Sequence, residues 1–352
     1  MNSPMAEPKI SQGTLLIQRA KDKISRQWSP YVKIGISKSI PPRDIIGGSS
    51  EYILTVYAIK SPMIENLKKQ LISTFSHCRA KGQMFLMDDQ TVISEIIPEA
   101  ERIATNQNES LSAFQSKVLL KSEESSGLIR KPTDRELELH NQIIDAKRDL
   151  KVKLTNQEII KRFLYDEISN SSGIPGVLKL TSRTRKPRLQ KARLKEDYRP
   201  IYLQYETEKL SKPSGTLKIK GAPTIEKIDP TLYNALKDTE KRSQFNIQQL
   251  DKPSSDRTTS TIINHSKYLD NLGDIAKAKW LYESLTAQLA ACVGLDDGIE
   301  GLISWKRKIR KKLIFDEDSF RKNHPEIYSE YLEPEKTSVI SRISPYGVYE
   351  YK

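Results

Sequence analysis

The amino-acid sequence predicts an α+β fold, in which a small mixed sheet flanked by helices is followed by a helical middle region and a C-terminal α+β module. In the first hundred residues, short runs rich in β-branched and aromatic residues alternate with segments of helical periodicity. Two capping-box patterns, Thr133 to Glu136 and Thr155 to Glu158, predict helix starts further along the chain. A long helical pattern that ends at Gly294 then opens the last segment.

The first predicted domain spans residues 12–105. Its strands are expected at residues 13–20, 31–37, 51–59 and 83–87, and its helices at residues 41–48, 64–75 and 91–104. The helix at 64–75 has Ile64, Leu67, Leu71 and Phe75 on one face. The order β-β-α-β-α-β-α describes a small mixed sheet covered by helices.

The rest of the chain divides into four further segments by composition. These are a polar linker at 106–132, a helical hairpin at 133–170, a basic arm and loop-rich region at 171–268, and a helix-strand-helix module at 269–352. The two helices of the hairpin would join near residue 154, either as a plain hairpin, which is the commoner arrangement, or as a helix-turn-helix DNA reader. We find no internal repeat in the sequence.

The charge balance favours a polyanionic partner. Lys and Arg number 58 against 45 Asp and Glu, which gives a net charge of +13. Such a surplus attracts nucleic-acid backbones, although a basic protein need not bind them. The hydrophobic fraction of 37% predicts small cores rather than one large core.

The sequence indicates neither a membrane nor an oxidising compartment. Cys78 and Cys292 lie far apart and follow no metal-binding spacing, and no apolar run is long enough to cross a bilayer. The start of the sequence lacks the layout of a secretory signal. We therefore expect a soluble intracellular protein, in a bacterium, an infected host cell or a virion. The sequence identifies no protein partner.

The densest cluster of positive charge follows residue 182. Its cations are Arg183, Arg185, Lys186, Arg188, Lys191, Arg193, Lys195 and Arg199. Because this segment has few apolar residues, it is expected to be either a flexible arm that follows phosphates or a solvated tether.

Trp305 stands among a second group of cations that includes Lys306 and Arg307. An aromatic ring among cations is able to stack on a base while the cations hold phosphates. The alternative places Trp305 on the core side of a strand across residues 301–315, with the cations in solvent.

Two segments in the first domain carry a resemblance to a known family. Lys33–Ile34–Gly35 is followed eight residues later by Arg43, and the stretch from Leu71 to Phe85 contains Arg79 and Gly82–Gln83–Met84–Phe85. These segments resemble the GIY-YIG nuclease superfamily, in the branch from phages, viruses and bacteria that has Lys-Ile-Gly as its second motif. The resemblance covers residues 12–105.

The resemblance implies a metal-dependent phosphodiester cleavage, with Mg²⁺ or Mn²⁺ held by a glutamate, a tyrosine-linked base and an arginine that steadies the phosphate. Lys33 and Arg43 match family positions. Leu15 replaces the first tyrosine, and Lys68 stands where the metal-binding glutamate is expected. Glu65, one helical turn before Lys68, is the candidate replacement for that ligand.

A weaker resemblance covers residues 270–352, which are similar to the C-terminal tail of phage recombination exonucleases. The matching strings are Asp297–Gly298–Ile299–Glu300–Gly301, Ser304–Trp305–Lys306, Phe315–Asp316 and His324–Pro325–Glu326–x–Tyr328. Only a non-catalytic module is implied, because the catalytic core of those enzymes has no counterpart here.

The leading interpretation is a nucleic-acid-binding protein of phage, viral or mobile-element type, with DNA favoured over RNA, built on a degenerate GIY-YIG domain. It requires no cofactor for binding and uses Lys33, Arg43, Lys68 and the two basic segments. One alternative is an active Mg²⁺- or Mn²⁺-dependent endonuclease with Arg43 and Glu65 as catalytic residues. The other is a structural or interaction protein, for example one associated with a virion or genome, that uses the fold as a docking surface.

Overall fold

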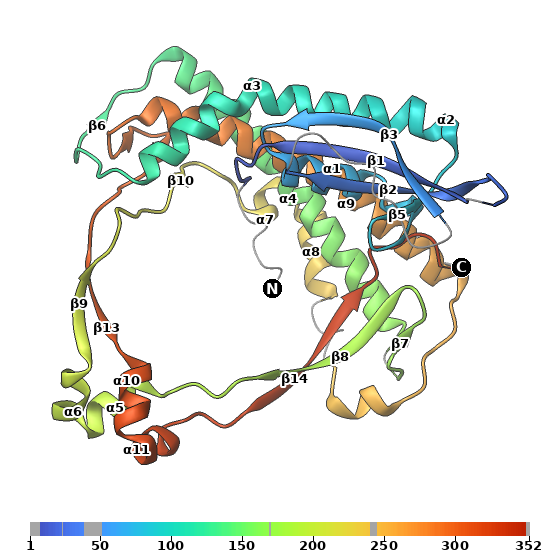
Figure 1. Cartoon of the computed structure of the whole chain (residues 1–352). Helices are drawn as coiled ribbons and strands as arrows, with labels where there is room; N and C mark the ends of the chain where they lie inside the picture. The colour runs from blue at the N-terminus through green and yellow to red at the C-terminus, as the bar shows by residue number, and fades with distance from the viewer. Residues whose placement is uncertain (1–7, 23, 39–50, 169, 240–244, 350–352) are drawn as a thin grey trace.

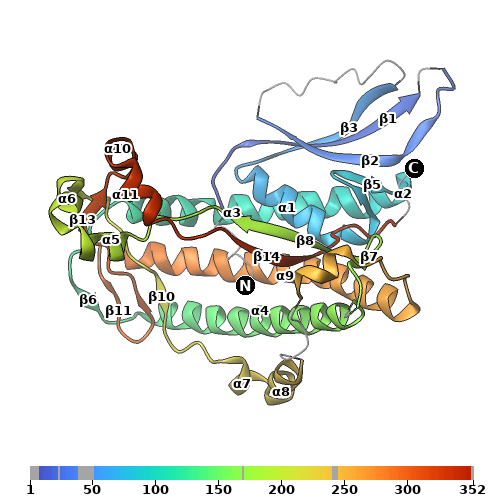
Figure 2. The same cartoon turned by 90° about the horizontal axis from the view of Figure 1, so that it is seen from below.

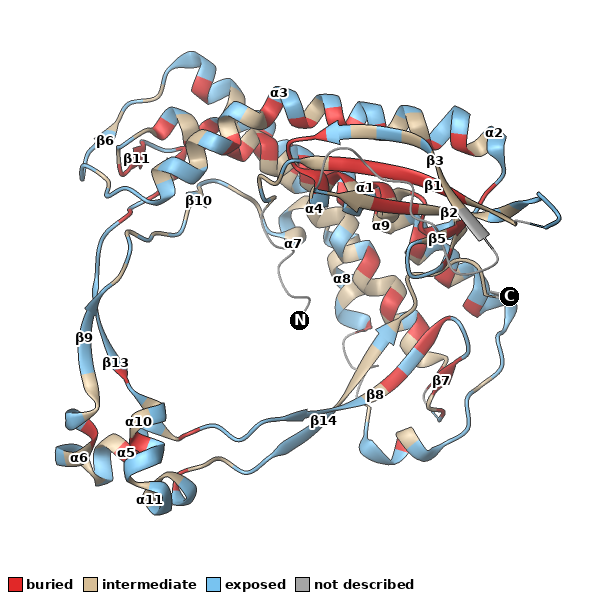
Figure 3. Ribbon diagram, in the orientation of Figure 1, coloured by how far each residue is buried: buried red, intermediate tan, exposed pale blue. Residues whose placement is uncertain are grey.

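The computed structural model describes residues 8–22, 24–38, 51–168, 170–239 and 245–349. They form a body of sheet and long helices, and two thin two-stranded ribbons lead from this body to a small helical knob (Figure 1). The predicted α+β class is confirmed. Buried residues concentrate in the body and in the knob, whereas the ribbons are largely exposed (Figure 3).

The N-terminal part is a five-stranded sheet in the order β3-β1-β2-β5-β4. Its strands are β1 (Gly13–Asp22), β2 (Trp28–Ser37), β3 (Glu51–Ser61), β4 (Arg79–Lys81) and β5 (Met84–Leu86), and all of its pairings are antiparallel. Helix α1 (Ile64–Thr74) packs with the following helices on the Leu15 and Ile34 side of the sheet. The predicted elements are present here, except that the helix expected at 41–48 lies outside the described residues.

The last helix of this domain is longer than predicted. After the short α2 (Asp89–Thr91) and a π-helical turn η2 (Val92–Ile96), helix α3 runs from Ile97 to Lys121. The prediction of a linker at 106–132 is therefore wrong for its first part. The helical face continues through Phe114, which stacks on Trp280 with ring centroids 5.4 Å apart. A partner so distant in the sequence supplies the contacts that keep this polar segment helical.

Two long helices form the centre of the body. They are α4 (Asp134–Asp166) and α9 (Thr259–Val293), which lie side by side and run in opposite directions (Figure 2). The capping box at Thr133 is confirmed. The predicted break near residue 154 is wrong, because the Thr155 hydroxyl donates to the Lys151 carbonyl inside one continuous helix instead of capping a new one.

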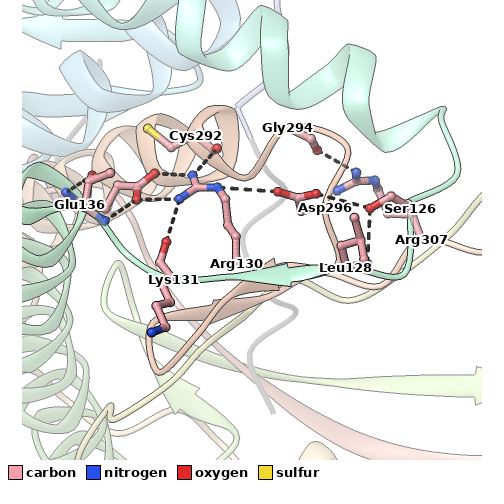
Figure 4. A network of polar contacts seen from close by, with 10 residues as sticks. Ser126, Leu128, Arg130, Lys131, Glu136, Cys292, Gly294, Asp296 and Arg307 are labelled. Atoms are coloured by element: carbon pink, nitrogen blue, oxygen red, sulfur yellow. Dashed lines mark hydrogen bonds and ion pairs between the residues drawn. The ribbon is translucent and has the colours of Figure 1, made fainter.

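A polar network ties the segment before α4 to the end of α9 (Figure 4). The Arg130 guanidinium donates to the Glu136 carboxylate and to the Cys292 carbonyl, and it lies 3.5 Å from Asp296. The hydrogen bond from Arg130 is the largest cause that lowers the pKa of Glu136 to about 2. Glu136 is therefore charged at neutral pH and holds both Arg130 and the start of α4.

The first ribbon consists of β8 (Leu178–Arg185) and β14 (Lys336–Ile343), and the second consists of β9 (Glu206–Leu210) and β13 (Lys311–Phe315). Both are antiparallel. The knob between them contains α5 (Lys191–Asp197), α6 (Arg199–Gln204), α10 (Glu317–Asn323) and α11 (Pro325–Glu330). Its own aromatic core includes Tyr202 stacked on Phe315, with ring centroids 4.3 Å apart.

The structure contains an internal repeat, which corrects the expectation from the sequence. Gly173–Ile174–x–Gly176 recurs 125 positions later as Gly298–Ile299–x–Gly301. Each forms the same hairpin: β7 (Gly173–Ile174) pairs with the start of β8, and β11 (Gly298–Ile299) pairs with β12 (Ile303–Ser304) in the same register. In both copies the glycine Cα faces the carbonyl five residues on.

The repeat extends through the preceding helix. The N-cap residues Thr133 and Thr258 are 125 positions apart, and so are His140 and His265. His140 Nε2 lies 3.0 Å from the carbonyl oxygen of Lys220, and His265 Nε2 lies 2.8 Å from that of Ser344. These carbonyls follow the corresponding edge strands β10 (Lys218–Ile219) and β14. The two copies therefore fold alike from the helix to the last strand.

The knob repeats as well. Ile201–Tyr202–x–x–Tyr205 in the first copy corresponds to Ile327–Tyr328–x–x–Tyr331 in the second. Each ribbon joins one strand from each copy, since β8 of the first pairs with β14 of the second, and β13 of the second with β9 of the first. Such reciprocal pairing is the pattern of a two-fold symmetric dimer. The chain is thus a covalent pseudo-dimer with an approximate two-fold axis.

The parts outside the two copies break this symmetry. The N-terminal domain packs on α9, where the Ser76 hydroxyl donates to the Leu269 carbonyl and Gly273 lets Thr74 approach. Helices α7 (Ile225–Ile228) and α8 (Pro230–Asp238) lie against α4, and Arg162 donates to the Leu236 carbonyl. The other described elements are the short β6 (Ile129–Arg130) and two 3₁₀ turns, η1 (Ser76–Cys78) and η4 (Ile247–Asp251).

Candidate nucleic-acid interface

Three cations of the N-terminal domain lie near one another. Lys68 projects from α1, Lys33 from β2 and Arg79 from β4. Burial lowers the pKa of Lys68, the charge of Glu65 raises it, and the charges of Arg79 and Lys33 lower it, so that it falls below its usual value. The structure thus places Lys33 and Lys68, two of the candidate site residues, near each other and near Arg79. Arg43 lies outside the described residues.

Arg79 is held in place by its surroundings. Its Nε donates to the Gly82 carbonyl at 2.7 Å, and its guanidinium lies 4.9 Å from the ring centroid of Tyr346. Tyr346 belongs to the segment after β14, whose Val348 amide donates to the Arg79 carbonyl. The C-terminal segment therefore fixes the edge of the sheet next to the cation cluster.

The surroundings of Glu65 do not fit a divalent metal. Glu65 is exposed, and its carboxylate lies 3.9 Å from the Lys38 ammonium. Within the described ranges, no group of three or more His, Cys, Asp or Glu side chains is placed to hold a metal ion. Metal ligands need lone pairs, whereas Lys38 beside Glu65, and Lys33 and Arg79 beside Lys68, carry ammonium and guanidinium ions.

The position of the first family tyrosine has a packing role. Leu15 is fully buried in the core between the sheet and α1. A Cβ on the neighbouring Gly13 would lie 2.9 Å from the Ser37 carbonyl oxygen. This end of β1 is therefore closely packed and offers no hydroxyl at position 15.

We expect no metal-dependent cleavage of DNA or RNA by the unsubstituted chain with Mg²⁺ or Mn²⁺, because Lys68 opposes a divalent ion and Leu15 supplies no base. Lys68→Glu is expected to allow metal binding without turnover. Cleavage rates for these two proteins and for Glu65→Ala provide the measurement. Cleavage by the unsubstituted chain that is lost in Glu65→Ala would establish Glu65 as a metal ligand and overturn this expectation.

The first ribbon has one basic face. Side chains alternate between the two faces of a strand, and opposite residues share a face. The register places Lys179, Arg183 and Arg185 of β8 on the same face as Arg342 and Lys336 of β14. All five are exposed, and none forms an ion pair within the part of the chain that the structure describes. This face, which we call the basic face, is able to contact phosphates directly.

The basic segment after residue 182 is ordered and does not form the predicted flexible arm. Arg183 and Arg185 are fixed in β8, and Lys191 and Arg193 lie in α5. Lys191 pairs with Glu317 at 2.8 Å, and Arg193 lies 3.6 Å from Asp197. Lys186 and Arg188 are exposed in the connection between strand and helix. Pairing with β14, more than 150 positions away, orders a segment that lacks apolar residues of its own.

The other basic segment, residues 305–312, leads into the second ribbon. Its first four residues alternate between buried and exposed. Lys306, Lys308 and Arg310 are exposed, whereas Trp305 and Arg307 are buried. The Arg307 guanidinium lies 4.3 Å from the centroid of the Trp305 ring and donates to the Gly294 carbonyl at 2.7 Å. The prediction that Trp305 and Arg307 contact nucleic acid is wrong, and Trp305 has the structural role given as its alternative.

A scan against protein-family models, a search of curated proteins and a search of solved structures gave no match. Among the described helices, none is long and apolar enough to cross a membrane.

Proposed function

We propose that this chain is a nucleic-acid-binding protein that contacts the phosphate backbone, with DNA favoured over RNA, and that needs no metal for binding. The observation that carries the proposal is the basic face of the first ribbon, with five exposed cations that have no ion pair among the described residues. Phosphate contacts of this kind supply most of non-specific affinity. The proposed setting is the interior of a bacterium or of an infected host cell, for a protein of phage, viral or mobile-element type.

We also propose that residues 12–105 are a GIY-YIG-like domain that has lost its metal site. The support is the three-stranded order β3-β1-β2 followed by α1, and the close approach of Gly13 to α1. The cations Lys33, Lys68 and Arg79 then serve as a second backbone contact. A lysine in place of a metal ligand attracts the phosphate that the metal would have bound.

Affinity for a DNA duplex is expected to fall steeply with salt concentration, because each neutralised phosphate contributes about −0.9 to the slope of log K against log salt. Arg183→Ala together with Arg185→Ala should weaken binding and reduce the magnitude of this slope by about 2. Titrations by fluorescence anisotropy at several salt concentrations measure both quantities.

The matched control is Lys191→Ala together with Arg193→Ala, which removes the same charge from side chains that are paired in the knob. This variant is expected to keep the slope of the unsubstituted chain. If the unsubstituted chain shows no salt-dependent binding to DNA or RNA, the proposed function is wrong. If both double variants reduce the slope equally, the basic face is not the contact surface.

A further inference from the structure

The approximate two-fold axis relates cations that lie in the two ribbons or directly beside them in the sequence. Arg183, Arg185 and Lys186 of the first copy correspond to Lys308, Arg310 and Lys311 of the second, 125 positions later in each case. All six are exposed. The two copies thus keep positive charge at the same three positions of the arm that leads to the knob.

A cation also recurs at corresponding positions of the edge strands in the two copies. Arg342, opposite Lys179 in the first ribbon, corresponds to Lys218, opposite Ser304 in the second copy. The second arm is the less strongly charged of the two, because Lys311 pairs with Glu208 at 2.7 Å. Lys308 and Arg310 have no ion pair within the described residues and are available to a ligand.

We propose that the two ribbons together bind one B-form DNA duplex, with the pseudo-two-fold axis of the protein lying on a two-fold axis of the duplex. Each ribbon then contacts one of the two antiparallel strands in the same way. This inference rests on the proposed function and specifies its ligand.

The symmetry is the reason to choose a duplex. The two antiparallel backbones of a duplex are related by two-fold axes perpendicular to the helix, and two-fold proteins bind DNA by matching such an axis. A single strand has no such axis and offers equivalent contacts to one ribbon at a time. Two ribbons with cations at matching positions therefore fit a double-stranded ligand.

The shape of the ribbons is the reason to choose DNA. The major groove of B-form DNA, about 12 Å wide, admits a two-stranded β-ribbon. The major groove of an RNA duplex is too deep and narrow to be read by side chains. The basic face also carries the exposed Ser338, whose hydroxyl is able to contact phosphate oxygens.

The test compares two double variants of the full chain that the pseudo-symmetry makes equivalent, Arg183→Ala with Arg185→Ala and Lys308→Ala with Arg310→Ala. Each should lower affinity for duplex DNA by a similar factor, of about tenfold, and the salt slope by about 2. The quadruple variant should combine both losses. Circular dichroism checks folding, and glutamine versions of the same variants replace any that fails to fold.

The ligands are a DNA duplex, one of its single strands and an RNA duplex of the same length, with Lys191→Ala and Arg193→Ala as the control. We expect one chain per short DNA duplex and at least tenfold weaker binding of the other two ligands. If the first double variant weakens binding and the second does not, or if the single strand or the RNA duplex binds as tightly as the DNA duplex, this inference is wrong while the proposed function stands. If the unsubstituted chain binds no nucleic acid, both are wrong.

Discussion

Arg307→Met is expected to lower the free energy of unfolding by about 3–5 kcal/mol, which is the usual effect of removing one partner from a buried charged network. Arg307 has no exposed surface. Its guanidinium donates to the carbonyls of Gly294 and Glu123, and burial lowers its pKa, although the nearby Asp297 charge raises it. Methionine keeps much of the volume but removes the donor to both carbonyls from the buried site that Arg307 occupies.

The measurement is the denaturant dependence of far-ultraviolet circular dichroism. Lys308→Met is the matched control, because Lys308 is a nearby cation that is exposed and has no ion pair within the described residues. Its effect should stay within about 0.5 kcal/mol. If the Arg307→Met protein unfolds at the same denaturant concentration as the unsubstituted chain, the hydrogen bonds from Arg307 to Glu123 and Gly294 do not stabilise the fold.

Gly173→Ala and Gly298→Ala are expected to destabilise the two copies alike, each by roughly 3 kcal/mol, because the added methyl group overpacks a rigid site. It would lie 2.4 Å from the Leu178 carbonyl oxygen in the first copy and 2.3 Å from the Ile303 carbonyl oxygen in the second. The obstacle in both copies is backbone, so no side-chain rotation relieves it.

Thermal unfolding of the two variants is compared with that of Gly35→Ala. A Cβ at Gly35 would meet the Gln18 side-chain oxygen at an ordinary 3.5 Å, so this control should change stability by about 1 kcal/mol or less. Equal losses in the two hairpins are expected from the repeat. A large loss at one glycine with none at the other would mean that the two hairpins do not have equivalent packing.

The sequence predicted best where local pattern and tertiary packing agree. The strands around Ile17 and Ile34, and the helix from Ile64, have their apolar residues on the face that is buried in the structure. Thr133 and Gly294 mark helix ends as predicted. These features depend on a few neighbouring residues, which a local pattern is able to report.

The sequence predicted poorly where a distant partner determines the structure. The alternating residues Leu178 and Leu180 are followed by Ser182 and Thr184, so the outer part of β8 looks unstructured without its pairing to β14. The sequence shows the charge of Arg307 but not the distant carbonyls that accept its hydrogen bonds, and it therefore favours a surface position for this side chain. The cluster of Lys33 with Lys68 was predicted from the resemblance, whereas Arg79 was not identified as its third member.

The internal repeat leaves a weak signal in the sequence. Gly-Ile-x-Gly and Ile-Tyr-x-x-Tyr each occur twice, about 125 positions apart. Other paired positions differ in residue type but are alike in burial; Ile168, which follows α4, and Val293, the last residue of α9, are both buried. Burial against the other copy conserves hydrophobic character rather than identity, so a comparison of residue types shows little of the duplication.

Joining the two copies in one chain also gives the molecule a direction. A homodimer has interchangeable ends, and a linear partner bound along it meets the same surface from either side. Here α9 carries the sheet domain while α4 carries α7 and α8, and the tyrosine-containing segment after β14 leads back to Arg79. The forward and reverse orientations of a bound linear partner are therefore chemically distinct, so that one orientation brings a given end of the partner to the sheet domain and the other takes it away.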